Sequence, residues 1–279
     1  MNLWENQKDA PPGASPLLEI EGLSVCAGRQ TILDSISLAV SAGRTTGIVG
    51  ESGSGKSMTA LSILGMLPAA LRRTQGSIRF EGKDLTTMAP DSLRELRGAA
   101  IAMVFQDPLA ALDPVMRIDD QVGEILRKRQ GLSRSAARAR AVELLERVDL
   151  PEPQLKARMY PHQLSGGQRQ RVVIAMALAG RPRLILADEP TTALDVSVQA
   201  KVLDLLRRLQ TEDGLGMILI SHDLRVMSHY ADDLVVMRNG QVVETGLAPQ
   251  VLANPSHDYT RHLVANVPTV HRRMLGEAS

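Results

Sequence analysis

The feature that most constrains the fold is a glycine-rich octapeptide, Gly50–Ser57 (GESGSGKS). It is preceded by Thr45–Val49, which has the residue types of a short buried strand, and followed by Met58–Leu67, which has the apolar spacing of a packed helix. Glycines let a loop wrap an anion with its backbone N–H groups turned inward, and the N-terminus of the next helix attracts the same negative charge. The pattern therefore predicts a strand, a phosphate-binding loop and a helix in succession, as in α/β nucleotide-binding proteins.

Each position of this loop has an expected role. Lys56 would reach the β- and γ-phosphates of a nucleotide, and the hydroxyl of Ser57 would bind Mg²⁺. The residues predicted to contact ATP here are Gly50, Glu51, Ser52, Gly53, Ser54, Gly55, Lys56 and Ser57. The alternative, a Gly/Ser loop with an incidental lysine, is disfavoured because the required strand and helix flank the loop.

Composition excludes several other classes of protein. With 279 residues, of which 44% are apolar and 23% charged, the chain can bury a sizeable core. A net charge of +1 and only one Trp, three Tyr and two Phe argue against a nucleic-acid surface. The single cysteine, Cys26, excludes intrachain disulfides and Cys-ligated metal sites within one chain. No apolar run is long enough to span a bilayer and the N-terminus lacks the layout of a secretory signal, so a soluble chain is expected.

Hydrophobic patterning predicts further elements along the chain. Strands are expected at 17–25, 32–40, 76–80, 101–105, 184–187 and 217–221, and helices at 198–210 and 224–230. Apolar residues separated by Arg, Lys and Glu predict a helical insertion at about 107–165. Asn239-Gly240, between apolar runs at 234–238 and 241–244, predicts a β-hairpin.

Two carboxylates, Asp188 and Glu189, directly follow the apolar run 184–187. They would lie at the C-terminal end of a buried strand, the edge at which ligands bind in open α/β sheets. Asp188 is placed to hold Mg²⁺ through water, and Glu189 to polarise an attacking water as a general base. Two acids after a strand are by themselves more often a helix cap or a solvated turn, but the phosphate loop earlier in the chain favours the catalytic interpretation.

A second anion-binding pattern, Leu164–Gln168 (LSGGQ), opens the helical run QRQRVVIAMALAG. Ser and two glycines at a helix start leave first-turn N–H groups directed at a ligand. One triphosphate does not need two cradles, so we expect the second to close over the nucleotide of another subunit.

With these motifs the sequence resembles the ATP-binding subunits of ABC transporters over nearly its whole length. Gly50–Ser57 is similar to the Walker A motif, Leu164–Gln168 to the signature motif and Leu184–Glu189 to Walker B. The resemblance implies an α/β fold, a P-loop NTPase of ABC type, in which a RecA-like core sheet carries an N-terminal antiparallel β subdomain and a helical insertion subdomain. The expected division is a disordered N-terminal tail at 1–16, an ABC ATPase domain at 17–270 with its helical subdomain at about 107–165, and a C-terminal tail at 271–279.

The resemblance also implies roles for single residues. Gln106 is similar to the Q-loop glutamine, which senses Mg²⁺ and the attacking water, and His222 to the switch histidine, which contacts the γ-phosphate. A lone glutamine or histidine is usually structural or solvent-exposed, but the order and spacing of the motifs favour the functional roles. The implied catalytic residues are Glu189, His222 and Gln106, and the implied Mg²⁺ ligands are Ser57, Gln106 and Asp188. The residues implied to act in trans are Ser165, Gly166, Gly167 and Gln168 of the signature and Asp195 of the D-loop (Ala193-Leu194-Asp195).

One stretch departs from the family pattern. Leu23–Arg29, which aligns with the loop whose aromatic side chain stacks on adenine, contains no aromatic residue. Stacking on the base is therefore not expected from this loop, and Trp4 would replace it only if the N-terminal tail folded back.

Other stretches resemble one branch of the family, the peptide/nickel importers. They are Phe105–Pro108, Tyr160–Leu164 and Asn254–Leu263 (NPSHDYTRHL). The segment 67–74, the missing aromatic residue and the absence of a cysteine-rich C-terminal segment favour the nickel-importer ATPases. The six histidines lack metal-ligand spacing, so direct nickel binding by this chain is not expected. Nickel, a metal chelate, di- or oligopeptides and other small solutes stay open as solutes.

The resemblance finally implies cofactors, partners and location. These are ATP and Mg²⁺, two transmembrane permease subunits, a second and paralogous ABC ATPase subunit, an extracytoplasmic solute-binding protein, no nucleic acid, and a peripheral position on the cytoplasmic face of the inner membrane. Two alternatives remain: a soluble ABC ATPase acting on nucleic acid or ribosomes, and a P-loop kinase, which would leave Leu164–Gln168 unexplained.

Overall fold

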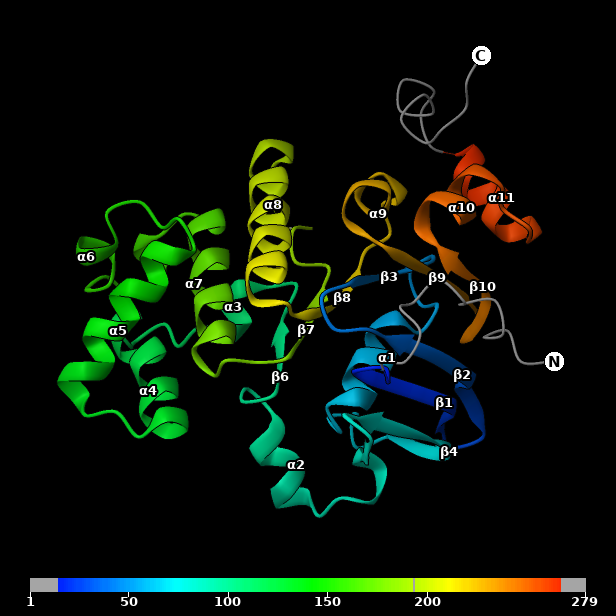
Figure 1. The fold of residues 1–279 in the computed structure, drawn as a ribbon, viewed down its shortest axis with the longest axis horizontal. Coiled ribbons are helices and arrows are strands. Elements are labelled where there is room, and N and C mark those ends of the chain that lie inside the picture. The colour runs from blue at the N-terminus through cyan, green and yellow to red at the C-terminus, as the bar shows by residue number, and fades with distance from the viewer. Residues whose placement is uncertain (1–14, 193, 267–279) are drawn as a thin grey trace. The chain divides into compact units, whose positions relative to one another are not determined.

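Antiparallel and parallel strands alternate with helices in the computed structural model, which describes residues 15–192 and 194–266 (Figure 1). The chain divides into two units, the first formed by the chain up to Leu93 together with the chain from Gly216, and the second by Arg94–Leu215. Trp4, Ala193, the predicted C-terminal tail at 271–279 and all but the last two residues of the predicted N-terminal tail lie outside the described residues.

An antiparallel sheet of the first unit has the strand order β2-β1-β4-β5. Its strands are β1 (Leu18–Ala27), β2 (Gln30–Val40), β4 (Leu71–Phe80) and β5 (Lys83–Asp84). β1 and β2 confirm two predicted strands, and their apolar side chains, including Leu23 and Leu38, are buried. The prediction for β4 was too short: the strand begins at Leu71 rather than at Gly76, because residues 71–73 continue to pair with β1 beyond a register shift.

The parallel strands of the first unit surround β3 (Thr45–Val49), which lies between β8 (Gly216–Ile220) and β9 (Asp233–Arg238). Every residue of β3 and β8 is buried, as expected for strands covered on both faces. The strand β10 (Gln241–Leu247) pairs antiparallel with β9, which confirms the predicted hairpin. Asn239 and Gly240 form its turn with φ angles of 49° and 77°.

Helices connect these strands. The first unit contains α1 (Lys56–Ile63), η1 (Leu85–Thr87), α9 (Leu224–Tyr230), α10 (Ala248–Ala253) and α11 (Asp258–Ala265), and α2 (Pro90–Leu96) leads into the second unit. α9 has the predicted bounds, whereas α1 ends four residues before the predicted Leu67, where Gly65 takes a left-handed φ of 61°. Patterning did not predict α2, α10 and α11, which are six to eight residues long.

The second unit contains two parallel strands, β6 (Ile101–Val104) and β7 (Leu184–Asp188), as predicted. Its helices are α3 (Pro108–Ala111), α4 (Ile118–Gln130), α5 (Arg134–Arg147), α6 (Pro153–Lys156), η2 (Pro161–Gln163), α7 (Gly166–Ala179) and α8 (Val196–Asp213). The elements α3 to η2 fall within the segment predicted as a helical insertion. Gly131 ends α4 in a left-handed conformation, and the Ser133 hydroxyl caps α5, so one helical block becomes a pair.

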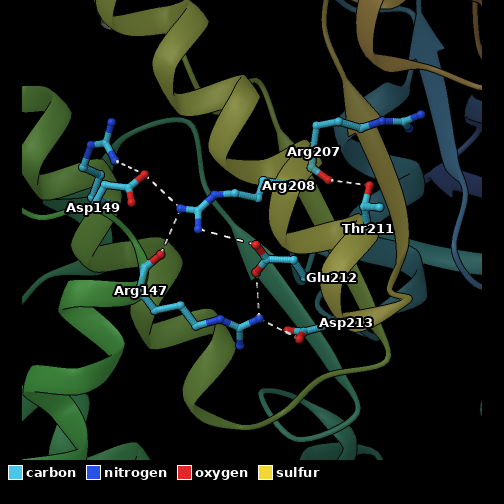
Figure 2. Close-up of polar contacts among 8 residues, drawn as sticks. Arg147, Asp149, Arg207, Arg208, Thr211, Glu212 and Asp213 are labelled. Atoms are coloured by element: carbon cyan, nitrogen blue, oxygen red, sulfur yellow. Dashed lines mark hydrogen bonds and ion pairs between the residues drawn. The ribbon is translucent and has the colours of Figure 1, made fainter.

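A network of charged side chains joins the end of α5 to α8 (Figure 2). Arg147 donates to Asp213 (2.6 Å), and this contact raises the pKa of the guanidinium. Arg208 donates to the Asp149 carboxylate (2.9 Å) and to the Arg147 carbonyl oxygen (3.1 Å). Arg171 of α7 also pairs with Asp149 (3.5 Å). The network therefore connects three helices of the second unit.

Among residues 15–192 and 194–266, no helix combines the length and apolarity needed to cross a membrane.

Candidate functional site

The glycine-rich loop connects β3 to α1, and its conformation depends on two glycines. Gly50 has φ 156°, and a Cβ there would lie 2.1 Å from the Met237 carbonyl oxygen. Gly55 has φ 102°, and a Cβ there would lie 2.5 Å from Leu33 Cδ2. Because backbone and core side chains approach so closely, any larger residue at either position would displace the loop.

Lys56 begins α1 and turns back over the loop. Its side chain is buried, and Nζ donates to the carbonyl oxygens of Gly50 (2.8 Å) and Glu51 (2.9 Å). The Ser54 hydroxyl is also buried and has no hydrogen-bond partner in the described part of the chain. A buried positive charge and an unsatisfied hydroxyl in one loop make a site that an anion would complete.

His222 lies after the end of the strand that neighbours β3, the strand leading into this loop. It follows β8, which pairs in parallel with β3, and the Ser221 N–H donates to the Ile48 carbonyl oxygen (3.2 Å). The next residue, Asp223, caps α9 by accepting from the Arg225 N–H (2.8 Å). Burial works to raise the pKa of Asp223, but hydrogen bonds from the Arg225 guanidinium outweigh it and lower the pKa. The exposed His222 thus precedes an anchored, ionised helix cap.

In the second unit, Gln106 and Glu189 come together. Gln106 follows β6 and Glu189 follows β7, and these strands are parallel neighbours. The Gln106 Nε2 donates to Glu189 Oε2 at 3.5 Å, and the Thr192 hydroxyl donates to the same oxygen at 2.9 Å. Asp188, the last residue of β7, is half-buried beside them. Thr192 was missed by the sequence analysis, although a hydroxyl residue three positions after a candidate base could have been noticed.

The signature residues form the start of α7. The Ser165 hydroxyl accepts from the Gln168 N–H (3.4 Å), and the Gln168 side chain accepts from the Ser165 N–H (3.2 Å), which is a capping box. A Cβ on Gly167 would lie 2.5 Å from Val198 Cγ1, so this glycine lets the helix start pack against α8. Asp195 caps α8 by accepting from the Val198 N–H (2.9 Å), and a hydrogen bond from Ser197 lowers its pKa.

The predicted site residues are therefore assembled in two groups. The phosphate loop and His222 belong to the first unit, and Gln106, the signature residues, Asp188, Glu189 and Asp195 to the second. Within each unit, neighbouring parallel strands bring together residues that are far apart in sequence. The sequence analysis also missed Tyr259, whose hydroxyl oxygen accepts from the Glu51 N–H of the loop (3.0 Å).

Comparison with known proteins identifies the class. The ABC transporter family profile matches residues 33–192, more than half of the chain, and the chain belongs to that family. It is an ATP-binding subunit of the ABC type, the class that hydrolyses ATP to drive transport.

Among solved structures, the cassette MJ0796, a dimer bound to ADP and Pi, is 31% identical over 83% of this chain and 98% of its own, with a TM-score of 0.73. CbiO1 from Clostridium perfringens is 27% identical over 94% of this chain and 99% of its own, with a TM-score of 0.76. The ABC-type α/β fold predicted from the sequence is confirmed.

Three curated relatives of the chain are named for the transport of peptides or peptidoglycan. A putative peptide import ATP-binding protein of Brucella abortus is 48% identical over 91% of this chain and 78% of its own length. The oligopeptide transport ATP-binding protein OppD of Bacillus subtilis is 44% identical over 91% of this chain and 72% of its own. The peptidoglycan transport ATP-binding protein YejF of Agrobacterium fabrum is 48% identical over 91% of this chain, which spans only 47% of that relative.

Proposed function

We propose that this chain energises the import of peptides or peptide-bearing fragments through partner permeases. The observation that carries the nucleotide part of this proposal is the phosphate loop, with its buried Lys56 and its unsatisfied Ser54 hydroxyl. The names of three similar proteins, which refer to peptide import, oligopeptide transport and peptidoglycan transport, support the solute class. None of these three is named for nickel.

We infer that Mg²⁺ accompanies the nucleotide. The residues that would hold it are Ser57, Gln106 and Asp188, and their side-chain oxygens are the hard donors this cation prefers. The Gln106 amide turns its NH₂ group toward Glu189, which leaves its carbonyl oxygen for a cation. The ion would supply charge neutralisation at the phosphates.

The proposed hydrolytic chemistry rests on this chain's own groups. Lys56 and the loop N–H groups would hold the triphosphate. Glu189 would accept the proton of the attacking water, Gln106 would orient that water, and His222 would contact the γ-phosphate. The hydrogen bonds from Gln106 and Thr192 support this assignment, because a general base must be held in one orientation.

We further propose that two ATPase subunits close head to tail. Ser165, Gly166, Gly167, Gln168 and Asp195 of one chain would then face the nucleotide of the other. A paralogous second ATPase, two permease subunits and an extracytoplasmic binding protein would complete an importer, with this chain peripheral on the cytoplasmic face of the inner membrane. ATP bound between the two chains would favour the closed pair, and hydrolysis would release it.

The first experiment is uptake of labelled oligopeptides and of nickel by cells that lack the gene. The wild-type gene, but not Lys56→Ala, is expected to restore peptide uptake. Restoration of nickel uptake instead would move the solute to nickel. No transport defect would favour the alternative of a soluble ATPase that acts on nucleic acid or ribosomes.

A second experiment isolates the base. Glu189→Gln should keep ATP binding and closure but lose turnover. Glu152→Gln is the matched control, because Glu152 has a similar left-handed backbone (φ 50°) and an exposed side chain. Normal hydrolysis by Glu189→Gln would overturn the assignment.

A further inference from the structure

A tyrosine near the C-terminal end of the described chain contacts the phosphate loop directly. Tyr259 lies in α11, and its hydroxyl oxygen accepts a hydrogen bond of 3.0 Å from the Glu51 N–H. Glu51 is the second residue of the loop, between Gly50 and the exposed tip at Ser52 and Gly53. The peptide group of the Glu51 N–H also carries the Gly50 carbonyl oxygen, which accepts from Lys56 (2.8 Å), so one peptide group is held by both the tyrosine and the lysine.

The tyrosine ring is fixed by its surroundings. The side chain is 4% exposed, and the Arg238 guanidinium lies over the ring at 4.8 Å from its centroid. Burial raises the pKa of the Tyr259 hydroxyl, so the group stays neutral and keeps its place as an acceptor. Arg238 ends β9, directly after Met237, whose carbonyl oxygen approaches Gly50. The residue that fixes the tyrosine ring is therefore the chain neighbour of the residue that packs against Gly50.

A buried carboxylate sets the position of α11. Glu244 of β10 accepts hydrogen bonds from the Ser256 N–H (2.7 Å), the Ser256 hydroxyl (2.8 Å) and the His257 N–H (3.1 Å). The His257 side chain then caps α11 by accepting from the Tyr259 N–H (3.1 Å). A continuous set of hydrogen bonds therefore runs from β10 through the turn at 256–257 to the tyrosine and the phosphate loop.

We propose that Tyr259 is a positioning residue for the phosphate loop, and that segment 254–263 sets nucleotide affinity through it. The tyrosine holds the Glu51 N–H, and the Glu51 carbonyl oxygen accepts from the Ser54 N–H (3.2 Å). The start of the loop is thereby fixed, and its other N–H groups would converge on the phosphates. The proposal rests on the proposed function, because it needs the loop to bind a nucleotide. Segment 254–263, which resembles the peptide/nickel importers, would thereby act on the nucleotide site.

The test is titration of the purified full-length chain with a fluorescent ADP analogue. Tyr259→Phe keeps the ring and its contact with Arg238 but leaves the Glu51 N–H without this acceptor. Loss of one such bond is expected to weaken ADP binding about three- to tenfold. Tyr160→Phe is the matched control, because its hydroxyl interacts with Arg117 in the other unit, and it should bind ADP like the wild type.

Two further measurements separate positioning from simple stabilisation. The thermal unfolding midpoint without nucleotide should stay within a few degrees of the wild type in Tyr259→Phe. In the assembled transporter the KM for ATP should rise while kcat stays unchanged. Arg238→Gln, which alters an exposed residue, should also weaken binding and serves if Tyr259→Phe does not fold.

The outcomes are distinct. Wild-type ADP affinity in Tyr259→Phe, or in Arg238→Gln where the former does not fold, overturns the role of Tyr259. Equal ADP affinity in Lys56→Ala and the wild type would instead overturn nucleotide binding at this loop. A loss in Lys56→Ala with a smaller loss in Tyr259→Phe supports both.

Discussion

The hydroxyl of Thr192 donates a hydrogen bond of 2.9 Å to the Glu189 carboxylate, on the same oxygen that Gln106 contacts at 3.5 Å. The Thr192 N–H also donates to the Glu189 carbonyl oxygen (3.3 Å). The backbone and the side chain of Glu189 are therefore both tied to the residue three positions later, and the carboxylate has one preferred orientation.

Removing that hydroxyl tests its value for catalysis. Thr192→Val keeps the shape of the side chain but removes the 2.9 Å hydrogen bond to the Glu189 carboxylate, so kcat for ATP hydrolysis should fall about three- to thirtyfold while the KM for ATP stays constant. Steady-state hydrolysis by the assembled transporter gives both numbers. Thr211→Val is the control, because the Thr211 hydroxyl donates within α8 to the Arg207 carbonyl oxygen at 3.0 Å (Figure 2). It also donates to the Gln210 side chain of the same helix at 3.4 Å. Equal losses in both variants would show that the effect is not specific to the base.

Because Gly167 packs against Val198, the effect of Gly167→Ala on the free energy of unfolding should depend on the residue at position 198. Gly167→Ala should lower the free energy of unfolding by about 1–3 kcal/mol, because its methyl group would lie 2.5 Å from Val198 Cγ1. With Val198→Ala in place, the same substitution should become neutral or stabilising, since alanine favours a helix over glycine. Urea unfolding of the four members of this double-mutant cycle measures the coupling. Additive effects would contradict the steric explanation.

The charged network of α5, α7 and α8 should be weak and sensitive to salt. Its side chains are about one-third or more exposed at Arg147, Arg208 and Glu212. Arg208→Leu is therefore expected to cost at most about 1 kcal/mol in dilute buffer and less in 1 M NaCl. Arg207→Leu is the matched control on the same helix, because its side chain points away from this network (Figure 2). A loss that does not change with salt would mean that Arg208 acts by packing.

Acid should loosen the C-terminal segment through Glu244. Burial acts to raise the pKa of this carboxyl, but the hydrogen bonds it accepts outweigh burial, and the pKa lies below its ordinary value of 4.5. The stabilisation is therefore complete above about pH 4.5 and is lost as the pH falls through the lower native pKa. The protection factors for amide hydrogen exchange of residues 256–265, which correct for the intrinsic pH dependence of exchange, should fall over that range in the wild type. Glu244→Gln should have lower protection factors already at pH 7, with less dependence on pH. Identical profiles for both proteins would exclude the carboxylate as the anchor.

Local patterns in the sequence accounted for the elements around the phosphate loop. The run Thr45–Val49, the Asn239-Gly240 turn and the helix Leu224–Tyr230 carry their own signals, namely apolar residues, a turn dipeptide and helical spacing. The motif order also placed Gln106 and Glu189 at the ends of two strands that proved to be parallel neighbours.

Other features depend on tertiary contacts that no local pattern encodes. β4 starts at Leu71 because β1 supplies partners for four residues before Gly76, which a polar stretch of sequence does not reveal. α11 is eight residues long and is held by Glu244, a single charged residue on another element. The contact between Tyr259 and Glu51 joins positions 208 residues apart, so only the folded chain shows it.

Glu189 occupies a left-handed backbone conformation with φ 44°, a region that glycine and asparagine adopt more readily. For any residue with a Cβ, that region costs about 1 kcal/mol or more. At its proposed catalytic position the chain therefore has a glutamate in a backbone conformation that is better suited to glycine. Selection for thermostability alone would relieve this strain by Glu189→Gly, whereas the proposed role of Glu189 as general base predicts that the variant no longer hydrolyses ATP.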